Sequence, residues 1–257
     1  MKNRRIAVVT GASKGIGRGI ARRLARDGFS IVVNYASDQA GAEETAAQVA
    51  AEGSEALLFQ ADVGVSEEVN ALFDQVEKEW GICEVLVNNA GVQTWKPLLE
   101  LEEPEWDRTI RTNLKGTFLC TQRAARDMAS NGRQGCIVNI GSGCNKGPFP
   151  KLVDYSASKG GIELLTRVSA VELGPLGIRV NCVAPGAIEI ERTQQEAPNY
   201  AATWSPITPL RRVGQVEDVA DVVAFLASEG GRFIHAQTIY VDGGLFSQMV
   251  WPYELEG

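Results

Sequence analysis

The chain has 257 residues, of which 44% are hydrophobic and 22% are charged, and its formal net charge is −7. This length and apolar content are sufficient for one α/β domain that spans residues 1–257 and buries a full core. Lys and Arg are scattered along the sequence, which argues against nucleic acid as a partner. No apolar run approaches the roughly 18 residues of a membrane span, so we expect no membrane partner either.

The five cysteines lie at positions 83, 120, 136, 144 and 182 and form neither a Cys-x-x-Cys pair nor a metal-ligand spacing. This pattern predicts reduced thiols, no metal site and a cytoplasmic protein. Cys144 differs from the others because it follows Ser142 in a loop, where it could line a pocket. A Ser-His-Asp hydrolase would depend on His235, the only histidine, and no Gly-x-Ser-x-Gly elbow surrounds Ser142.

Predicted strands and helices alternate along the whole chain. The sequence predicts strands at residues 6–10, 30–35, 56–63, 85–87, 136–140, 178–183 and 238–241. It predicts helices at residues 18–27, 40–52, 66–80, 105–128, 154–173 and 216–226. Such alternation requires a parallel sheet with helices on both faces, so we predict a single-domain, doubly wound Rossmann fold with seven strands.

A glycine-rich turn, Gly11-Ala-Ser-Lys-Gly-Ile-Gly17, connects the first predicted strand to the first predicted helix. Glycines at such a turn let the backbone approach a pyrophosphate closely, and the helix N-terminus behind it favours an anion. The turn therefore predicts a dinucleotide-binding site. Its candidate contacts are Gly11, Ser13, Lys14, Gly15, Ile16 and Gly17.

The end of the second predicted strand bears on the choice of cofactor. It reads Asn34-Tyr35-Ala36-Ser37 and carries no carboxylate before Asp38. A carboxylate at this place bonds the ribose 2′-hydroxyl of NAD and repels the 2′-phosphate of NADP. Asn34, Tyr35 and Ser37 are therefore candidate contacts, and Lys14 could reach a phosphate unless it is simply a solvated charge. NADP is the expected cofactor, with use of NAD left open.

Tyr155 and Lys159 lie one turn apart on one face of the predicted helix 154–173. A free tyrosine loses its proton only near pH ~10, and a fixed cation close by favours the phenolate. The pair is therefore a candidate acid/base centre, with the Ser142 hydroxyl as a group that could polarise a carbonyl. Alone, the same spacing is also found in ordinary surface helices.

The chain resembles the short-chain dehydrogenase/reductase family over essentially its whole length, in five features taken in order: Thr10-Gly-Ala-Ser-Lys-Gly-Ile-Gly17, Asn88-Asn-Ala-Gly91, Ser142, Tyr155 and Lys159. The resemblance implies hydride transfer between a nicotinamide and a carbonyl or secondary alcohol carbon. It implies that Tyr155 exchanges the proton with the substrate oxygen, that Ser142 bonds this oxygen, and that Lys159 lowers the pKa of Tyr155 and binds the ribose. It also implies that Asn113, in a kinked helix, holds a water that links Lys159 to bulk solvent.

The same resemblance implies further cofactor contacts. Asp62-Val63 match the adenine-binding dipeptide, although Asp62 could instead cap the turn before the next helix. Asn89, Ala90 and Gly91 would lie against the ribose. Pro185, Gly186 and Ile188 match the turn whose backbone holds the nicotinamide carboxamide, while Tyr155 and Lys159 would also contact the cofactor. The family usually has Thr where this chain has Ile190, and Thr193 is a candidate replacement.

Candidate substrate residues lie on loops at the carboxyl end of the sheet, where open α/β folds bind ligands. They are Gln93, Trp95, Ser142, Cys144, Asn145, Tyr155, Glu189 and Arg192. Residues 186–210 are expected to form a mobile substrate lid, and residues 245–257 a C-terminal tail. Because this set is polar with one large aromatic side chain, it favours a sugar or small polar substrate over a long acyl chain.

Two groups within the family are similar to the chain. Residues 148–155 and the tail resemble glucose 1-dehydrogenases, whereas Asn34-Tyr35 and Lys14 resemble 3-oxoacyl-acyl-carrier-protein reductases, which gives the alternative activity. A dinucleotide-binding sensor without turnover is a further alternative on the same fold. The resemblance also implies a homotetramer that pairs helices 105–128 and 154–173. We expect the apolar residues 246–253 to be buried in this tetramer, either against a neighbouring subunit or against their own subunit.

Overall fold

The computed structural model describes residues 4–248. Its strands are β1 (Ile6–Val9), β2 (Ser30–Tyr35), β3 (Ala56–Gln60), β4 (Val85–Asn88), β5 (Gly135–Ile140), β6 (Ile178–Pro185) and β7 (Thr238–Val241). They form one sheet in the order β3-β2-β1-β4-β5-β6-β7, and every neighbouring pair is parallel. The predicted fold class, a doubly wound seven-stranded parallel sheet, is confirmed.

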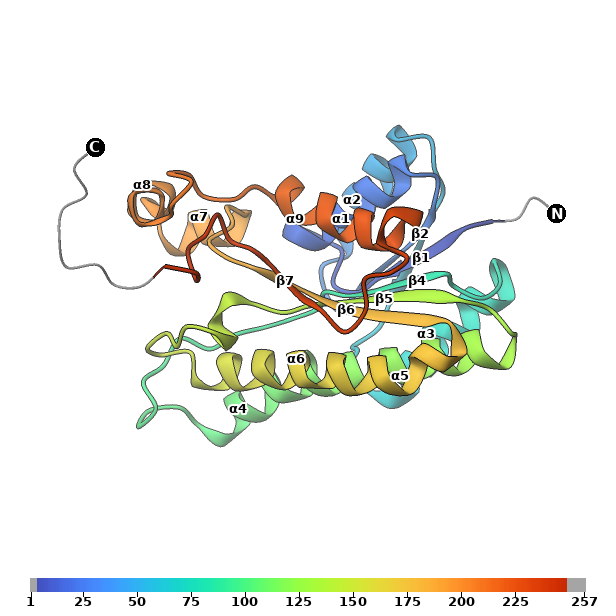
Figure 1. Cartoon of the computed structure of the whole chain (residues 1–257), viewed down its shortest axis with the longest axis horizontal. Helices are drawn as coiled ribbons and strands as arrows, with labels where there is room; N and C mark the ends of the chain where they lie inside the picture. The colour runs from blue at the N-terminus through green and yellow to red at the C-terminus, as the bar shows by residue number, and fades with distance from the viewer. Residues whose placement is uncertain (1–3, 249–257) are drawn as a thin grey trace.

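Helices cover both faces of the sheet (Figure 1). Helices α1 (Gly15–Arg26), α2 (Gln39–Ala51) and α9 (Val216–Ala227) pack on one face, and α3 (Ser66–Glu79), α5 (Gly116–Ser130) and α6 (Val153–Leu173) pack on the other. Strand β1 lies between β2 and β4 in the interior of the sheet, and its side chains enter the two cores alternately, Ala7 and Val9 on one face and Ile6 and Val8 on the other. This burial on both faces explains its unbroken apolar sequence.

The predicted helix at residues 105–128 is in fact three consecutive segments. Helix α4 (Glu103–Thr109) is followed by a π-helical turn at Ile110–Lys115 and then by α5. Asn113 is fully buried within this π-helical turn. Single π-helical turns inside α-helices are frequent at functional sites, and this one gives the expected kink a defined form.

The segment predicted as a mobile substrate lid, residues 186–210, contains two short helices, α7 (Glu191–Glu196) and α8 (Tyr200–Trp204). Figure 1 shows both beside the dark red end of the described chain. Hydrogen bonds join these two parts, from Leu210 N to Gly243 O at 3.2 Å and from Gln248 Nε2 to Ile207 O at 2.6 Å. The segment is therefore tied to the chain that follows β7. The remainder of the predicted tail, residues 249–257, lies outside the described residues.

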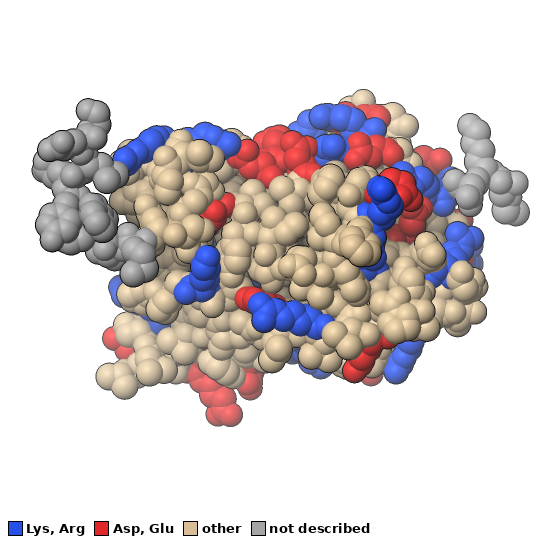
Figure 2. All heavy atoms as spheres, in the orientation of Figure 1, with Lys and Arg blue, Asp and Glu red and all other residues tan. Residues whose placement is uncertain are grey.

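Charged side chains of both signs lie on the surface (Figure 2), and most of the cysteines are buried. On the face shown in Figure 2, basic and acidic side chains are interspersed. Within residues 4–248, no helix combines the length and apolar character needed to cross a membrane. The five cysteines are free thiols, of which only Cys144 is partly exposed, and burial raises the pKa of Cys83 and Cys120 to about 12.

Candidate active site

Ser142 and Tyr155 meet at the carboxyl edge of β5. Ser142 lies two residues after the strand in an extended conformation, and its Oγ accepts a 3.2 Å hydrogen bond from Cys144 N. Tyr155 lies in the first turn of α6. Burial raises the pKa of Tyr155 to about 12, and the nearby Ser142 hydroxyl opposes this only in part. The phenol is therefore protonated at neutral pH and placed beside a hydroxyl, as a proton donor to a carbonyl requires.

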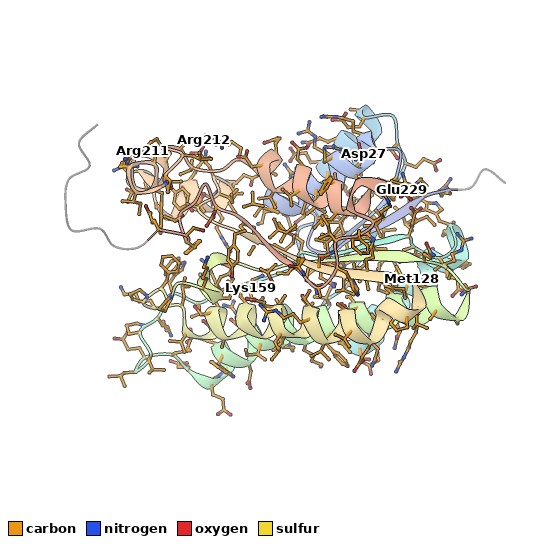
Figure 3. The ribbon with its side chains drawn as sticks, viewed as in Figure 1. Asp27, Met128, Lys159, Arg211, Arg212 and Glu229 are labelled. Atoms are coloured by element: carbon orange, nitrogen blue, oxygen red, sulfur yellow. The ribbon has the colours of Figure 1, made fainter. Side chains whose placement is uncertain are left out.

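Lys159 is buried, and its Nζ donates a 2.7 Å hydrogen bond to the main-chain oxygen of Ile140. Figure 3 shows Lys159 on the side of α6 that faces the sheet. Its Nζ lies 5.5 Å from the ring centroid of Tyr155, and burial lowers the pKa of Lys159 to about 8. Desolvation of the Tyr155 phenol outweighs the Ser142 and Arg192 neighbours that favour its charged form, and the expected lowering of this pKa by Lys159 stays a prediction.

The Asn113 side chain connects the loop after β4 to α6. Its Nδ2 donates to Val92 O at 2.9 Å and to Ser158 Oγ at 3.0 Å, while its Oδ1 accepts from Val92 N at 2.8 Å. Ser158 Oγ in turn donates to the main-chain oxygen of Tyr155 at 2.7 Å. Since the amide is fully engaged, Asn113 positions the helix that carries Tyr155 and Lys159. Any water link to solvent would use other atoms, such as its main-chain oxygen.

The glycine-rich turn leaves no room for a side chain at Gly11 or Gly17. A Cβ added to Gly11, which has a φ of +59°, would lie 2.7 Å from Ala90 Cα. One added to Gly17 would lie 2.5 Å from Asn89 Nδ2, which itself donates to Thr10 O and Gly11 O at 2.9 Å each. The loop at residues 89–91 is thereby held directly against the turn.

The N-terminus of α1 suits a pyrophosphate. Helix α1 is preceded by Lys14 in an extended conformation, with no side-chain cap and no acidic residue in its first turn. The N–H groups of that turn and the positive end of the helix dipole are therefore available to an anion. Together with the close backbone packing at Gly11 and Gly17, these features fit a dinucleotide, although Ser13 is itself buried.

The candidate residues at the end of β2 separate into two classes. Asn34 is buried, and its Oδ1 accepts from Gly11 N at 3.2 Å while its Nδ2 donates to Ala61 O at 3.0 Å. Tyr35 is buried in the core. The Asn34 side chain therefore bonds the glycine-rich turn and the Tyr35 side chain packs in the core, and a cofactor contact at these two residues stays a prediction. Ser37 and Lys14 are exposed, and Lys14 Nζ lies 3.9 Å from an Asp38 carboxylate oxygen.

Asp62 forms the predicted turn and an ion pair that was not predicted. Its Oδ1 accepts from Gly64 N at 2.9 Å, and its Oδ2 lies 2.8 Å from an Arg111 guanidinium nitrogen. Val63 is buried, and a Cβ added to Gly116 would lie 2.7 Å from it. The side chain of Val63 thus packs in the interior, which leaves its backbone to contact an adenine.

The turn after β6 is built by close backbone contact. Gly186 N donates to Val241 O at 2.9 Å, and a Cβ on Gly186 would lie 2.7 Å from Asp242. Ile188 forms an isolated bridge with Gly214. Thr193 does not replace the hydroxyl that Ile190 lacks, because its Oγ1 is hydrogen-bonded to the N and O atoms of Ile190 at 2.9 Å. This hydroxyl instead caps α7.

Besides Ser142 and Tyr155, four of the candidate substrate residues lie beside the reacting groups or on the loops around them. Cys144 is partly exposed beside Ser142, and burial raises the pKa of its thiol. The Arg192 guanidinium acts electrostatically on Tyr155 and donates to Gln93 Oε1 at 3.4 Å, which joins α7 to the loop after β4. Trp95 is 53% exposed on that loop.

Two of the candidate substrate side chains make other contacts. Asn145 Oδ1 accepts from the Tyr240 hydroxyl at 3.2 Å, and its Nδ2 donates to the Glu163 carboxylate. This side chain lines an open groove of about 570 Å³ between α6 and β7, and a substrate contact at Asn145 stays a prediction. Glu189 accepts from Gln215 Nε2 at 3.3 Å. Within the described residues, no cluster of three or more His, Cys, Asp or Glu side chains could hold a metal.

Sequence reasoning missed four aromatic side chains near the catalytic loop. The rings of Phe149 and Phe246 are 5.7 Å apart, those of Phe149 and Trp204 are 5.9 Å apart, and those of Tyr200 and Trp204 are 6.1 Å apart. Burial raises the pKa of Tyr200 to about 12. We call these residues, Phe149, Tyr200, Trp204 and Phe246, the aromatic wall. One available signal was the spacing of Tyr200 and Trp204, which puts both on one helical face.

Comparisons with known proteins cover nearly the whole chain. Residues 11–246 match a family model described as Enoyl-(Acyl carrier protein) reductase. A 3-oxoacyl-[acyl-carrier-protein] reductase FabG of Staphylococcus aureus is 41% identical over 96% of this chain and 100% of its own length. A short-chain type dehydrogenase/reductase of Picea abies is 41% identical over 93% of this chain and 92% of its own.

Solved structures give a similar result. The crystal structure of a putative gluconate dehydrogenase from Agrobacterium tumefaciens aligns with a TM-score of 0.90 and 34% identity over 95% of this chain and 97% of its own. That of acetoin dehydrogenase from Enterobacter cloacae aligns with a TM-score of 0.89 and 33% identity over 99% of this chain and 100% of its own. Since both identities exceed 30% at almost complete coverage, the similarity extends beyond the fold.

Proposed function

We propose a substrate and a set of residue roles for this chain. The chain belongs to the short-chain dehydrogenase/reductase family and is an NAD(P)-dependent oxidoreductase of carbonyls and secondary alcohols. The substrate we propose is a compact polar ketone or the corresponding alcohol. The observation that carries the proposal is the meeting of Ser142 and Tyr155 at the carboxyl edge of β5, with Lys159 buried behind them.

In the direction of reduction, Tyr155 donates the proton and Ser142 donates a hydrogen bond to the same carbonyl oxygen. A bound nicotinamide supplies or accepts the hydride. Because the pKa of Tyr155 is raised to about 12, the phenol holds its proton until a carbonyl oxygen gains negative charge. Lys159, with a pKa of about 8, is mostly protonated at neutral pH and stabilises the phenolate that remains.

Asn113 serves this centre as a positioning residue. Its side chain connects Val92 to Ser158, and Ser158 bonds the main chain of Tyr155. The same π-helical turn places the main-chain oxygen of Asn113 at a break in regular helical bonding. We assign to it the water-mediated proton path between Lys159 and solvent that the family resemblance implies.

We propose NADP as the preferred cofactor, with NAD also accepted. Lys14 and Ser37 are exposed at the end of β2, and both could bond a 2′-phosphate. Asp38 works against a strong preference, because its carboxylate lies 3.9 Å from Lys14 Nζ. The hydrogen bond from Gly41 N lowers the pKa of Asp38, so this charge persists at neutral pH.

Two of the aligned structures support a compact substrate. The aligned structures are described as a gluconate dehydrogenase and an acetoin dehydrogenase, which are named for a hydroxy acid and a hydroxy ketone. The second candidate function is 3-oxoacyl-acyl-carrier-protein reduction, and the observation in its favour is the 41% identity to FabG. Purified enzyme should therefore be assayed with NADPH for reduction of acetoin, 2,3-butanedione and acetoacetyl-CoA, and with NADP⁺ for oxidation of gluconate and glucose. Turnover confined to the thioester would favour the second candidate.

We further propose a cytoplasmic homotetramer. In the single chain, helices α5 and α6 expose four apolar side chains to solvent: Phe118, Leu164, Val168 and Val171. A groove of about 240 Å³ lies between these helices. Contiguous apolar surface of this kind supports association through α5 and α6. Val171, 76% exposed, is the site to test: Val171→Glu should reduce the mass in sedimentation equilibrium, and an unchanged mass would exclude this interface. The free cysteines support the cytoplasmic assignment.

A further inference from the structure

The ring of Phe246 lies directly against the backbone of Gly143, the residue after Ser142. A Cβ added to Gly143 would be 1.8 Å from Phe246 Cε2 and 2.2 Å from Cδ2. Gly143 does not have a positive φ, so its backbone conformation suits any residue. The glycine is therefore required by the contact with the ring. Gly147 faces the same ring less closely, since its added Cβ would lie 3.2 Å from Phe246 Cδ1.

Hydrogen bonds from backbone N–H groups to the Asp242 carboxylate hold the turn that carries this ring. The Asp242 carboxylate accepts from Gly244 N and from Phe246 N, each at 2.9 Å. Gly243 and Gly244 have φ values of +60° and +87°, which reverse the chain immediately after β7. Gly243 and Gly244 also pack against Thr208 and Pro209. The position of Phe246 is thus set by the lid segment as well as by its own turn.

Phe246 is one end of the aromatic wall defined above. Its ring meets Phe149 at an interplanar angle of 87°, and Phe149 meets Trp204 at 68°, both edge to face. Such contacts stabilise each ring pair beyond the area that they bury. At the other end of the wall, Tyr200 interacts electrostatically with Tyr155 and Cys144. Aromatic side chains from three segments therefore extend from the catalytic loop to α8.

We propose that Phe246 is a specificity-determining residue, which limits the length of the substituent on the reacting carbon by its contact with Gly143. This inference rests on the proposed function. A substituent directed toward Gly143 meets a ring that is fixed by Asp242 and by Phe149. A long acyl chain would have to displace this ring, whereas a one- or two-carbon substituent would not. The wall therefore selects compact ketones and alcohols.

The first experiment compares a short and a long substrate. In Phe246→Ala, we expect the ratio of kcat/KM for 2,3-octanedione to that for 2,3-butanedione to rise by about tenfold, which corresponds to one lost steric barrier of about 1.4 kcal/mol. The matched control is Phe233→Ala, because Phe233 is 100% exposed and should leave the ratio unchanged. An unchanged ratio in Phe246→Ala would overturn the proposal.

The second experiment does not need turnover. Cys144, next to Gly143, is the only cysteine of the five that is partly exposed. We expect Phe246→Ala to accelerate labelling of Cys144 by a pyrene maleimide more than labelling by N-ethylmaleimide, with Cys144→Ser identifying the site. Equal acceleration of both reagents would contradict a size limit at this point. If no diketone is reduced by any variant, the proposed substrate class fails, and the labelling still decides whether Phe246 limits access.

Discussion

The Lys159 ammonium donates a 2.7 Å hydrogen bond to the main-chain oxygen of Ile140, the last residue of β5. This bond fixes α6 against the strand that leads to Ser142, so the same lysine that serves the phenol also sets the relative position of the two catalytic segments. The hydrogen bond places the Lys159 ammonium in the interior, where desolvation lowers its pKa to about 8.

The buried ammonium makes folding stability depend on pH. Between the folded pKa of about 8 and the ordinary value of 10.5, the unfolded chain binds more protons at Lys159 than the folded chain does. The stability contribution of Lys159 is therefore fully present above the ordinary value and is lost as pH falls through about 8. Relative to Lys159→Met, the wild type should gain roughly 3 kcal/mol of unfolding free energy across this window.

Urea denaturation of both proteins at several pH values measures this difference. The comparison cancels the contributions of groups that do not interact with Lys159, such as the Cys83 thiol with its raised pKa, whereas those of Cys144 and Cys182 remain in the difference. A free-energy difference that stays constant between about pH 8 and pH 10.5 would show that Lys159 is not desolvated.

Asn113→Ala should destabilise the fold and lower kcat. The substitution removes three hydrogen bonds, two to Val92 and one to Ser158, and at about 1 kcal/mol each the expected loss of unfolding free energy is roughly 3 kcal/mol. Asn70→Ala, at an exposed position on α3, is the matched control and should be nearly neutral. If kcat falls while KM for the cofactor is unchanged, the positioning role is supported. A variant with wild-type kcat would exclude it.

Ala36→Asp should shift preference toward NAD. Ala36 is the exposed residue that follows β2, whereas the preceding Tyr35 is buried, so only position 36 presents a new carboxylate to the ribose. We expect the ratio of kcat/KM with NADP to that with NAD to fall by about tenfold, with Ala36→Asn as the uncharged control. A wild-type enzyme that already prefers NAD would show that Lys14 and Ser37 do not bind a phosphate.

Gly143→Ala should be much more destabilising in the wild type than in Phe246→Ala. The added Cβ would lie 1.8 Å from the ring, so it must displace Phe246 when the ring is present and meets less resistance when it is absent. Gly147→Ala provides the graded comparison, because its closest approach to the ring is 3.2 Å. Thermal unfolding of the four proteins in this double-mutant cycle gives the coupling. Additive effects would mean that the two residues do not touch.

Most of the fold follows from local patterns in the sequence. The buried strands have continuous apolar runs, and the spacing of Tyr155 and Lys159 alone places both on one helical face. The π-helical turn around Asn113 could not be predicted in this way, because a buried side-chain network between distant segments stabilises it. The turn of the Asn34 side chain into the interior has a similar cause, since its partners lie on β3 and at Gly11.

The motif residues Ser142, Tyr155 and Lys159 lie together in the structure, whereas the directions of several other side chains could not be predicted from the sequence. Asn145 turns away because Glu163 and Tyr240 offer it partners on the far side of the loop. The aromatic wall was missed because Phe149 and Phe246 are distant in sequence and meet only through the turn at Asp242. The candidate substrate site, for which the sequence predicts mainly polar side chains, therefore also has the aromatic wall on one side.

The most direct test of the central claim is the steady-state rate of NADPH oxidation with 2,3-butanedione by the wild type and by Tyr155→Phe. The substitution removes only the phenolic oxygen, so the fold and the glycine turn that would hold the dinucleotide should be preserved. We expect kcat to fall by about a thousandfold with the dissociation constant for NADPH nearly unchanged, because proton transfer is lost and cofactor binding is not. A kcat close to that of the wild type would contradict the assignment of Tyr155 as the proton donor.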